Sequence, residues 1–102
     1  MLERLTVDDF MPAVGDVFVL DGGDAGAFEL RLTEASLYDP QSAAIDGDGR
    51  RSPFRLVFTG PADPLLAQQT CRLEHPTVGA LEIFIVPVRR TGEGTDYEAI
   101  FA

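Results

Sequence analysis

The sequence predicts an all-β fold, either a small antiparallel six-stranded barrel or a two-layer sandwich, with a short N-terminal helix. β-Branched and aromatic residues gather in short segments that turn residues separate, most clearly Phe54–Thr59, Thr70–His75, Ala80–Val88 and Asp96–Phe101. Within most of these segments apolar and polar residues alternate, as they do in half-buried strands. Long helical patterns do not alternate with the strands, which argues against a parallel α/β fold.

A short helix and a strand are expected first. Thr6 is placed to cap a helical turn over Val7–Met11, and Asp9, three residues after the cap, fits a capping box. Asp16–Leu20 follows as the first strand. The sequence Asp21-Gly22-Gly23-Asp24 then indicates a hairpin connection, because such turns favour Gly and Asp.

The second strand, expected over Ala27–Tyr38, changes its apolar side part-way along. Apolar residues at positions 28, 30 and 32 share one side, whereas those at 35 and 37 fall on the other. A strand has a side-chain period of two, so this one must bend, bulge or end near Thr33–Glu34. The polar segment Asp39–Ser52 follows as the longest loop and the most natural place for a surface-borne function.

Four segments make up the C-terminal half. Phe54–Thr59 is a strand, and Asp63-Pro64 resembles a helix start, so Leu65–Gln69 is expected to form one helical turn. Further strands are expected over Thr70–His75, Ala80–Val88 and Asp96–Phe101, joined by a turn at Pro76–Gly79 and a polar loop at Arg89–Thr95.

The strand Ala80–Val88 is apolar on both sides. One side consists of Leu81, Ile83 and Ile85, and the other of Phe84, Val86 and Val88. Such a strand is central in a wrapped sheet, or is covered by another element or by a partner. Pro87 cannot donate to a ladder, which places it at an edge or a bulge. The candidate interaction residues are therefore Phe84, Val86 and Val88, with packing beneath the N-terminal turn as the alternative.

Residue patterns for catalysis, cofactor binding or metal binding are weak. The one histidine, His75, lies about 13 Å from Cys71 along an extended strand, beyond the reach of a dyad. We expect His75 to end its strand and hydrogen-bond a turn carbonyl, and the lone Cys71 to be a small buried thiol. Asp46-Gly47-Asp48-Gly49 begins like a calcium loop, but Arg50 and Val57 stand where oxygen ligands are needed.

Carboxylates offer one further route to chemistry. Glycosidases use a pair of them, and the candidates here are Glu34, Glu74, Glu82 and Glu98. Exposure on the strands beside Arg72 or Arg55 is the simpler interpretation. We therefore expect a protein that is not an enzyme and that carries no cofactor and no metal.

Composition restricts the partners. The 102 residues form one expected domain over 1–102, and they carry 17 acidic against 8 basic side chains, a net charge of −9. An acidic surface argues against nucleic-acid binding and against adsorption to anionic membranes. The N-terminal residues are acidic where a signal peptide is basic, and apolar stretches are too short for a membrane span, so a cytoplasmic location is expected.

A resemblance covers nearly the whole chain. The segments that carry it are Thr6–Phe10, Val14-Gly15, Pro53–Pro61, Cys71–Pro76, Gly79–Val88 and Tyr97–Phe101. In this order the chain resembles a bacterial domain of unknown function with members of about this length. That family has no established activity or site residues. Its association with phage-tail-like (tail-collar) proteins implies an assembly or accessory role.

The functional hypothesis is a non-enzymatic structural or protein-interaction module that docks onto itself or onto a protein partner. A small-ligand-binding β-barrel is the alternative, and it requires an enclosed apolar pocket. Hydrolase chemistry at Cys71 or His75 is the weakest of the three.

Overall fold

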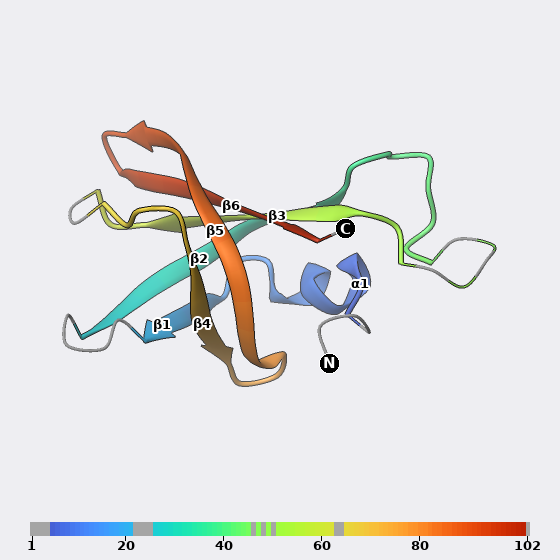
Figure 1. The fold of residues 1–102 in the computed structure, drawn as a ribbon, viewed down its shortest axis with the longest axis horizontal. Coiled ribbons are helices and arrows are strands. Elements are labelled where there is room, and N and C mark those ends of the chain that lie inside the picture. The colour runs from blue at the N-terminus through green and yellow to red at the C-terminus, as the bar shows by residue number, and fades with distance from the viewer. Residues whose placement is uncertain are drawn as a thin grey trace.

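The computed structural model describes residues 5–21, 26–45, 47, 49, 51–62 and 65–101. Within these residues, six antiparallel strands form a closed barrel, which confirms the all-β class and selects the barrel over the sandwich (Figure 1). The strands are β1 (Val17–Asp21), β2 (Ala27–Leu37), β3 (Phe54–Gly60), β4 (Gln69–His75), β5 (Gly79–Thr91) and β6 (Gly94–Phe101).

Around the barrel the strand order is β1-β2-β3-β6-β5-β4. Consecutive strands pair as meanders in each half of the chain, and β3–β6 and β1–β4 pairs join the two halves. Since β4 returns to lie beside β1, the strands form overlapping Greek keys. The β1–β4 pairing is short, with Val19 opposite Glu74 and Leu20 opposite Leu73.

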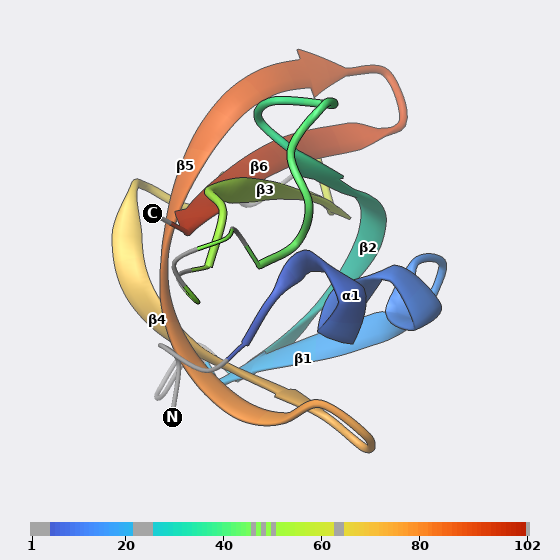
Figure 2. The ribbon, with the colours of Figure 1, turned by 90° about the vertical axis from the view of Figure 1, so that its right-hand side faces the viewer.

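The N-terminal helix covers one end of the barrel (Figure 2). It consists of α1 (Val7–Phe10) followed by a 3-10 turn, η2 (Met11–Ala13), and Thr6 begins it as expected. The Thr6 backbone N–H donates to Asp9 Oδ2 at 2.7 Å, which is the Asp version of a capping box. Phe10 is fully buried, with its ring 5.7 Å from that of Phe54.

Side chains fill the barrel interior along the described strands. Phe18 meets Phe58 edge-on at 5.3 Å, and Tyr97 has no exposed surface. Inward-facing and outward-facing positions alternate as predicted along β1 and β4, for example at Phe18 and Leu20 and at Cys71 and Leu73. The core aromatic and aliphatic residues include Phe10, Phe18, Leu30, Leu32, Phe54, Leu56, Phe58, Leu73, Ile85 and Tyr97.

Both predicted irregularities are present. The β2–β3 register shifts between Leu32 and Glu34, so the apolar residues on either side of the bulge all face inward. The β5–β6 register shifts between Pro87 and Arg89. Each bulge adds one unpaired residue, which is how a strand can change its facing without leaving the barrel.

Two predicted connections differ from the structure. Residues 65–68 are not helical: the Leu66 N–H donates to the Tyr97 hydroxyl at 2.9 Å, and Gln69 already belongs to β4. Arg89–Thr95 is not a loop, because β5 continues to Thr91 and β6 starts at Gly94. The turn Gly22–Asp24 and the Asp63-Pro64 pair lie outside the described residues.

Candidate interaction surface

The outer side of β5 exposes Phe84 and Val88, which retain 51% and 53% of their accessible surface, while Val86 is half-buried. The N-terminal helix does not cover them, since it packs on rings at the end of the barrel such as Phe54 and Phe101. The alternative of packing beneath that helix therefore does not hold for the two exposed side chains.

β5 changes its pairing partner midway along its length. Gly79–Ile85 pairs with β4, and Val86–Thr91 pairs with β6, so β5 passes from one neighbour to the other midway. Figure 1 shows the strand crossing the front of the molecule and continuing into the β5–β6 hairpin. Phe84 and Val86 lie at the exchange point, on the side that faces away from the core.

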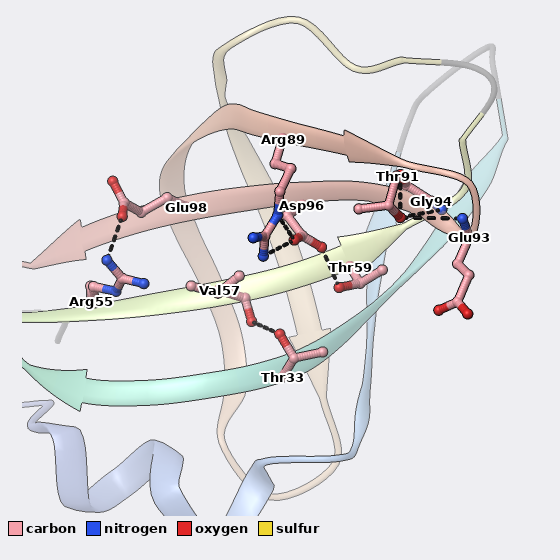
Figure 3. Close-up of polar contacts among 10 residues, drawn as sticks. All are labelled: Thr33, Arg55, Val57, Thr59, Arg89, Thr91, Glu93, Gly94, Asp96 and Glu98. Atoms are coloured by element: carbon pink, nitrogen blue, oxygen red, sulfur yellow. Dashed lines mark hydrogen bonds and ion pairs between the residues drawn. The ribbon is translucent and has the colours of Figure 1, made fainter.

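A groove of about 530 Å³ begins beside Val88 and extends over the outer face of the neighbouring strands. Figure 3 shows most of its polar side chains, which come from β2, β3, β5 and β6. The groove is lined by Thr33, Glu34, Arg55, Val57, Thr59, Val88, Arg89, Asp96 and Glu98. Val57 forms an apolar floor between charged walls.

Asp96 organises one half of the groove. Its Oδ1 accepts a 2.7 Å hydrogen bond from the Thr59 hydroxyl, and its Oδ2 accepts from Arg89 Nε at 3.0 Å and Arg89 Nη2 at 2.7 Å (Figure 3). The hydrogen bond from Thr59, then that from Arg89, lowers the pKa of this carboxyl below its ordinary value. An ionised, well-bound carboxylate suits a structural ion pair and not a general acid.

Arg55 organises the other half. Its Nε lies 3.2 Å from Glu34 Oε2, and its Nη1 lies 3.3 Å from Glu98 Oε2. Glu34 also accepts a 2.8 Å hydrogen bond from the Ser36 hydroxyl. Glu34 and Glu98 are thus held apart by the Arg55 guanidinium. Elsewhere on the barrel, Arg72 Nε lies 3.6 Å from Glu74 Oε1. These ion pairs support the structural interpretation of the carboxylates over a glycosidase pair.

His75 has both ring nitrogens engaged. Nδ1 accepts from the backbone N–H groups of Thr77 and Val78, each at 3.1 Å, and Nε2 lies 2.9 Å from Asp16 Oδ2. The ring is buried and stacks on Phe18 at 4.6 Å. The expected bond to a turn carbonyl is therefore wrong: the turn offers N–H donors instead, and the ring nitrogen accepts them.

Cys71 is buried in the core, on the same inward side of β4 as His75. Burial raises the pKa of its thiol to about 11, so the reactive thiolate is scarce at neutral pH. With the imidazole occupied by Asp16 and by the turn, the Cys–His dyad has neither an activated nucleophile nor a free base.

Clusters of metal-ligating side chains do not occur among the described residues. Asp46 and Asp48, which suggested the start of a calcium loop, lie outside those residues. Phe84 and Val86 lie on the side of β5 opposite Leu81, Ile83 and Ile85, as the alternation in the sequence predicts. Sequence reasoning missed the Arg89–Asp96–Thr59 cluster. Arg89 fell in a segment predicted as a loop, and no local signal pairs it with Thr59 on another strand.

The fold and this surface define a small closed β-barrel with a filled interior and ion-paired outer strands. The chain belongs to the DUF6916 family, described as a domain of unknown function, whose profile matches residues 5–101. The resemblance to a domain of unknown function is thereby confirmed. Comparison with curated proteins and with solved structures finds no match. Among the described helices, none has the length and apolar character needed to cross a bilayer.

Proposed function

We propose that this protein is a non-enzymatic structural or protein-interaction module that docks through the outer side of β5 and the adjoining groove. The exposure of Phe84 and Val88 on a regular strand is the observation that carries the proposal. Exposed apolar side chains rimmed by polar groups are typical of protein-binding surfaces. Val88 also lines the groove, so the apolar residues and the charged residues form one continuous surface.

The chemistry of the remaining candidates supports a binding role over catalysis. The Cys71 thiol is buried with a raised pKa, and His75 spends both nitrogens on structural hydrogen bonds. Carboxylates on the groove are neutralised by Arg55 and Arg89. None of these described groups is left poised to attack a substrate or to exchange a proton with it.

The ligand-binding alternative needs an enclosed apolar cavity in the barrel. Along the described strands the interior is occupied by side chains such as Phe18, Phe58 and Tyr97, which have no exposed surface. This packing favours an external surface over an internal ligand site.

The assembly to which the module belongs is, in this proposal, a bacterial phage-tail-like particle, assembled in the cytoplasm. Support comes from the sequence resemblance and from the acidic composition, which disfavours nucleic-acid and membrane partners.

Site-specific photo-crosslinking tests the proposal. A benzophenone amino acid replaces Val88 in one variant and Val19 in the control, because Val19 is also exposed and lies on β1. Crosslinking in the native cells is expected to give a discrete protein adduct from position 88 and none from position 19. If position 88 gives no adduct, either with another protein or with a second copy of this chain, the docking surface is refuted. Mass spectrometry identifies the protein in the adduct and so tests the phage-tail assignment.

A further inference from the structure

We propose that the partner on β5 is a second copy of this chain, docked across a two-fold axis that passes beside Ile85. The inference rests on the proposed function, since it names the occupant of the same surface. It is carried by the order of outward-facing side chains along β5, which is self-complementary. Closed two-fold contacts require this property, because each residue must match its symmetry-related counterpart.

The outward-facing order along β5 is acidic, apolar, apolar, basic: Glu82, Phe84, Val86 and Arg89. The bulge sets this order. Val86 pairs with Glu98 and Arg89 with Asp96, so the strand advances only two ladder positions between Val86 and Arg89. Arg89 therefore points to the same outer side as Val86. Val88 is the unpaired residue of the bulge, and it is exposed beside Arg89.

The two charged ends are equally far from the centre of this row. Glu82 precedes Ile85 by three strand positions, and Arg89 follows it by three once the bulged residue is left out. At about 3.3 Å per position, each charge lies roughly 10 Å from the axis. When two copies of β5 pack antiparallel, Phe84 of each copy lies against Val86 of the other, and Glu82 of each copy lies against Arg89 of the other.

Glu82 and Arg89 both have side-chain atoms that are free to form a further ion pair. Within the described part of the chain, the Glu82 carboxylate has no hydrogen bond or ion pair. Arg89 directs Nε and Nη2 to a single oxygen of Asp96, and its side chain is 69% exposed. The Nη1 group of Arg89 has no acceptor among the described residues, so a second carboxylate can bind without displacing Asp96.

Charge complementarity commits the surface to a second copy and not to an unrelated protein. The chain carries a net charge of −9, which opposes association of two copies in general. Association therefore depends on the local match on β5. Replacing a β5 glutamate by arginine should weaken the dimer through the lost ion pairs, although it reduces the overall repulsion between the two acidic chains. The two effects change the dissociation constant in opposite directions, so they can be told apart.

Analytical ultracentrifugation over a concentration series measures the dimer dissociation constant of the wild type, Glu82→Arg and Glu29→Arg. Both substitutions reverse one exposed glutamate, and Glu29 lies on β2, away from β5. Glu82→Arg is expected to weaken the dimer by at least about tenfold, as for loss of two interfacial ion pairs. Glu29→Arg, which lowers the net repulsion equally, is expected to leave the dimer unchanged or tighter.

Phe84→Ser is the second arm, and it is expected to weaken the dimer at least as much, with thermal melts confirming that each variant is folded. A wild type that stays monomeric to about 1 mM, or a dimer that Glu82→Arg does not weaken, overturns the inference. With either of these results, a crosslinked adduct between position 88 and a different protein would still support the proposed function. A monomer without any adduct would end both.

Discussion

Gly94 is the position where a single methyl group should most damage the fold that presents the β5 surface. It begins β6, where the β5–β6 hairpin passes the end of β3. A Cβ at Gly94 would overlap the backbone carbonyl oxygen of Gly60 and approach Thr59 Cγ2 to 3.3 Å. A backbone oxygen cannot rotate away as a side chain can, so Gly94→Ala must displace the hairpin from β3.

The expected cost follows from the nature of the clash. Inserting a methyl group into a packed site costs about 1–3 kcal/mol when side chains yield. Here the obstacle is backbone, so we expect about 3 kcal/mol for Gly94→Ala. For a domain of this size each kcal/mol lowers the melting temperature by roughly 4–8 °C, which gives a decrease of about 12–24 °C.

Urea and thermal unfolding followed by circular dichroism measure this effect. Gly92→Ala is the matched control, because it lies in the same hairpin and a Cβ there meets nothing within 4 Å. We expect the control to stay within about 0.5 kcal/mol of the wild type. Gly60→Ala should fall between them, since its Cβ meets the movable Leu30 side chain. If Gly94→Ala proves as stable as Gly92→Ala, the close approach of β6 to β3 is refuted.

Asp96 and His75 allow two further tests. Because the folded-state pKa of Asp96 is lowered by Thr59 and Arg89, Asp96→Asn should cost about 1–3 kcal/mol at pH 7. That deficit should shrink as the pH falls below about 4, because the Asp96 carboxyl of the unfolded chain binds a proton there before the folded one does. Urea unfolding at pH 7 and pH 3 measures the deficit, and an equal deficit at both pH values contradicts the prediction. Nitrogen-15 NMR should show neutral His75 protonated at Nε2, since Nδ1 accepts two backbone N–H groups; a proton on Nδ1 would contradict this.

The strands that alternate regularly could be predicted from the sequence, and so could the irregularities that break the alternation. The switch of apolar positions in β2 predicted a bend, a bulge or an end near Thr33–Glu34, and Pro87 predicted an edge or a bulge; the structure has a bulge at both places. The end of β5 was missed because its residues beyond Val88 are polar and project past the core, so hydrophobic alternation gives no signal there. The closure of the barrel was also beyond local reasoning, since it depends on the β3–β6 and β1–β4 pairings.

Part of the candidate surface could be predicted from the sequence, and part could not. Phe84, Val86 and Val88 were predictable because an apolar second side on one strand is visible in the sequence itself. The contacts Arg89–Asp96–Thr59 and His75–Asp16 were not, because their partners lie on other elements and, for His75 and Asp16, 59 residues apart. Ion pairs of this kind depend on the register between strands, which only the folded barrel defines.

The strands form two meanders that join as overlapping Greek keys. This arrangement determines where the chain can be divided into two fragments that still fit together. Each meander is a continuous half of the chain, and the two halves meet along the β3–β6 and β1–β4 seams. A break in the connection between β3 and β4 would therefore leave two fragments, each with one apolar side uncovered. Neither fragment could bury its core side chains by itself, yet their mutual fit would be intact, which makes this barrel suited to reconstitution from two separately produced pieces.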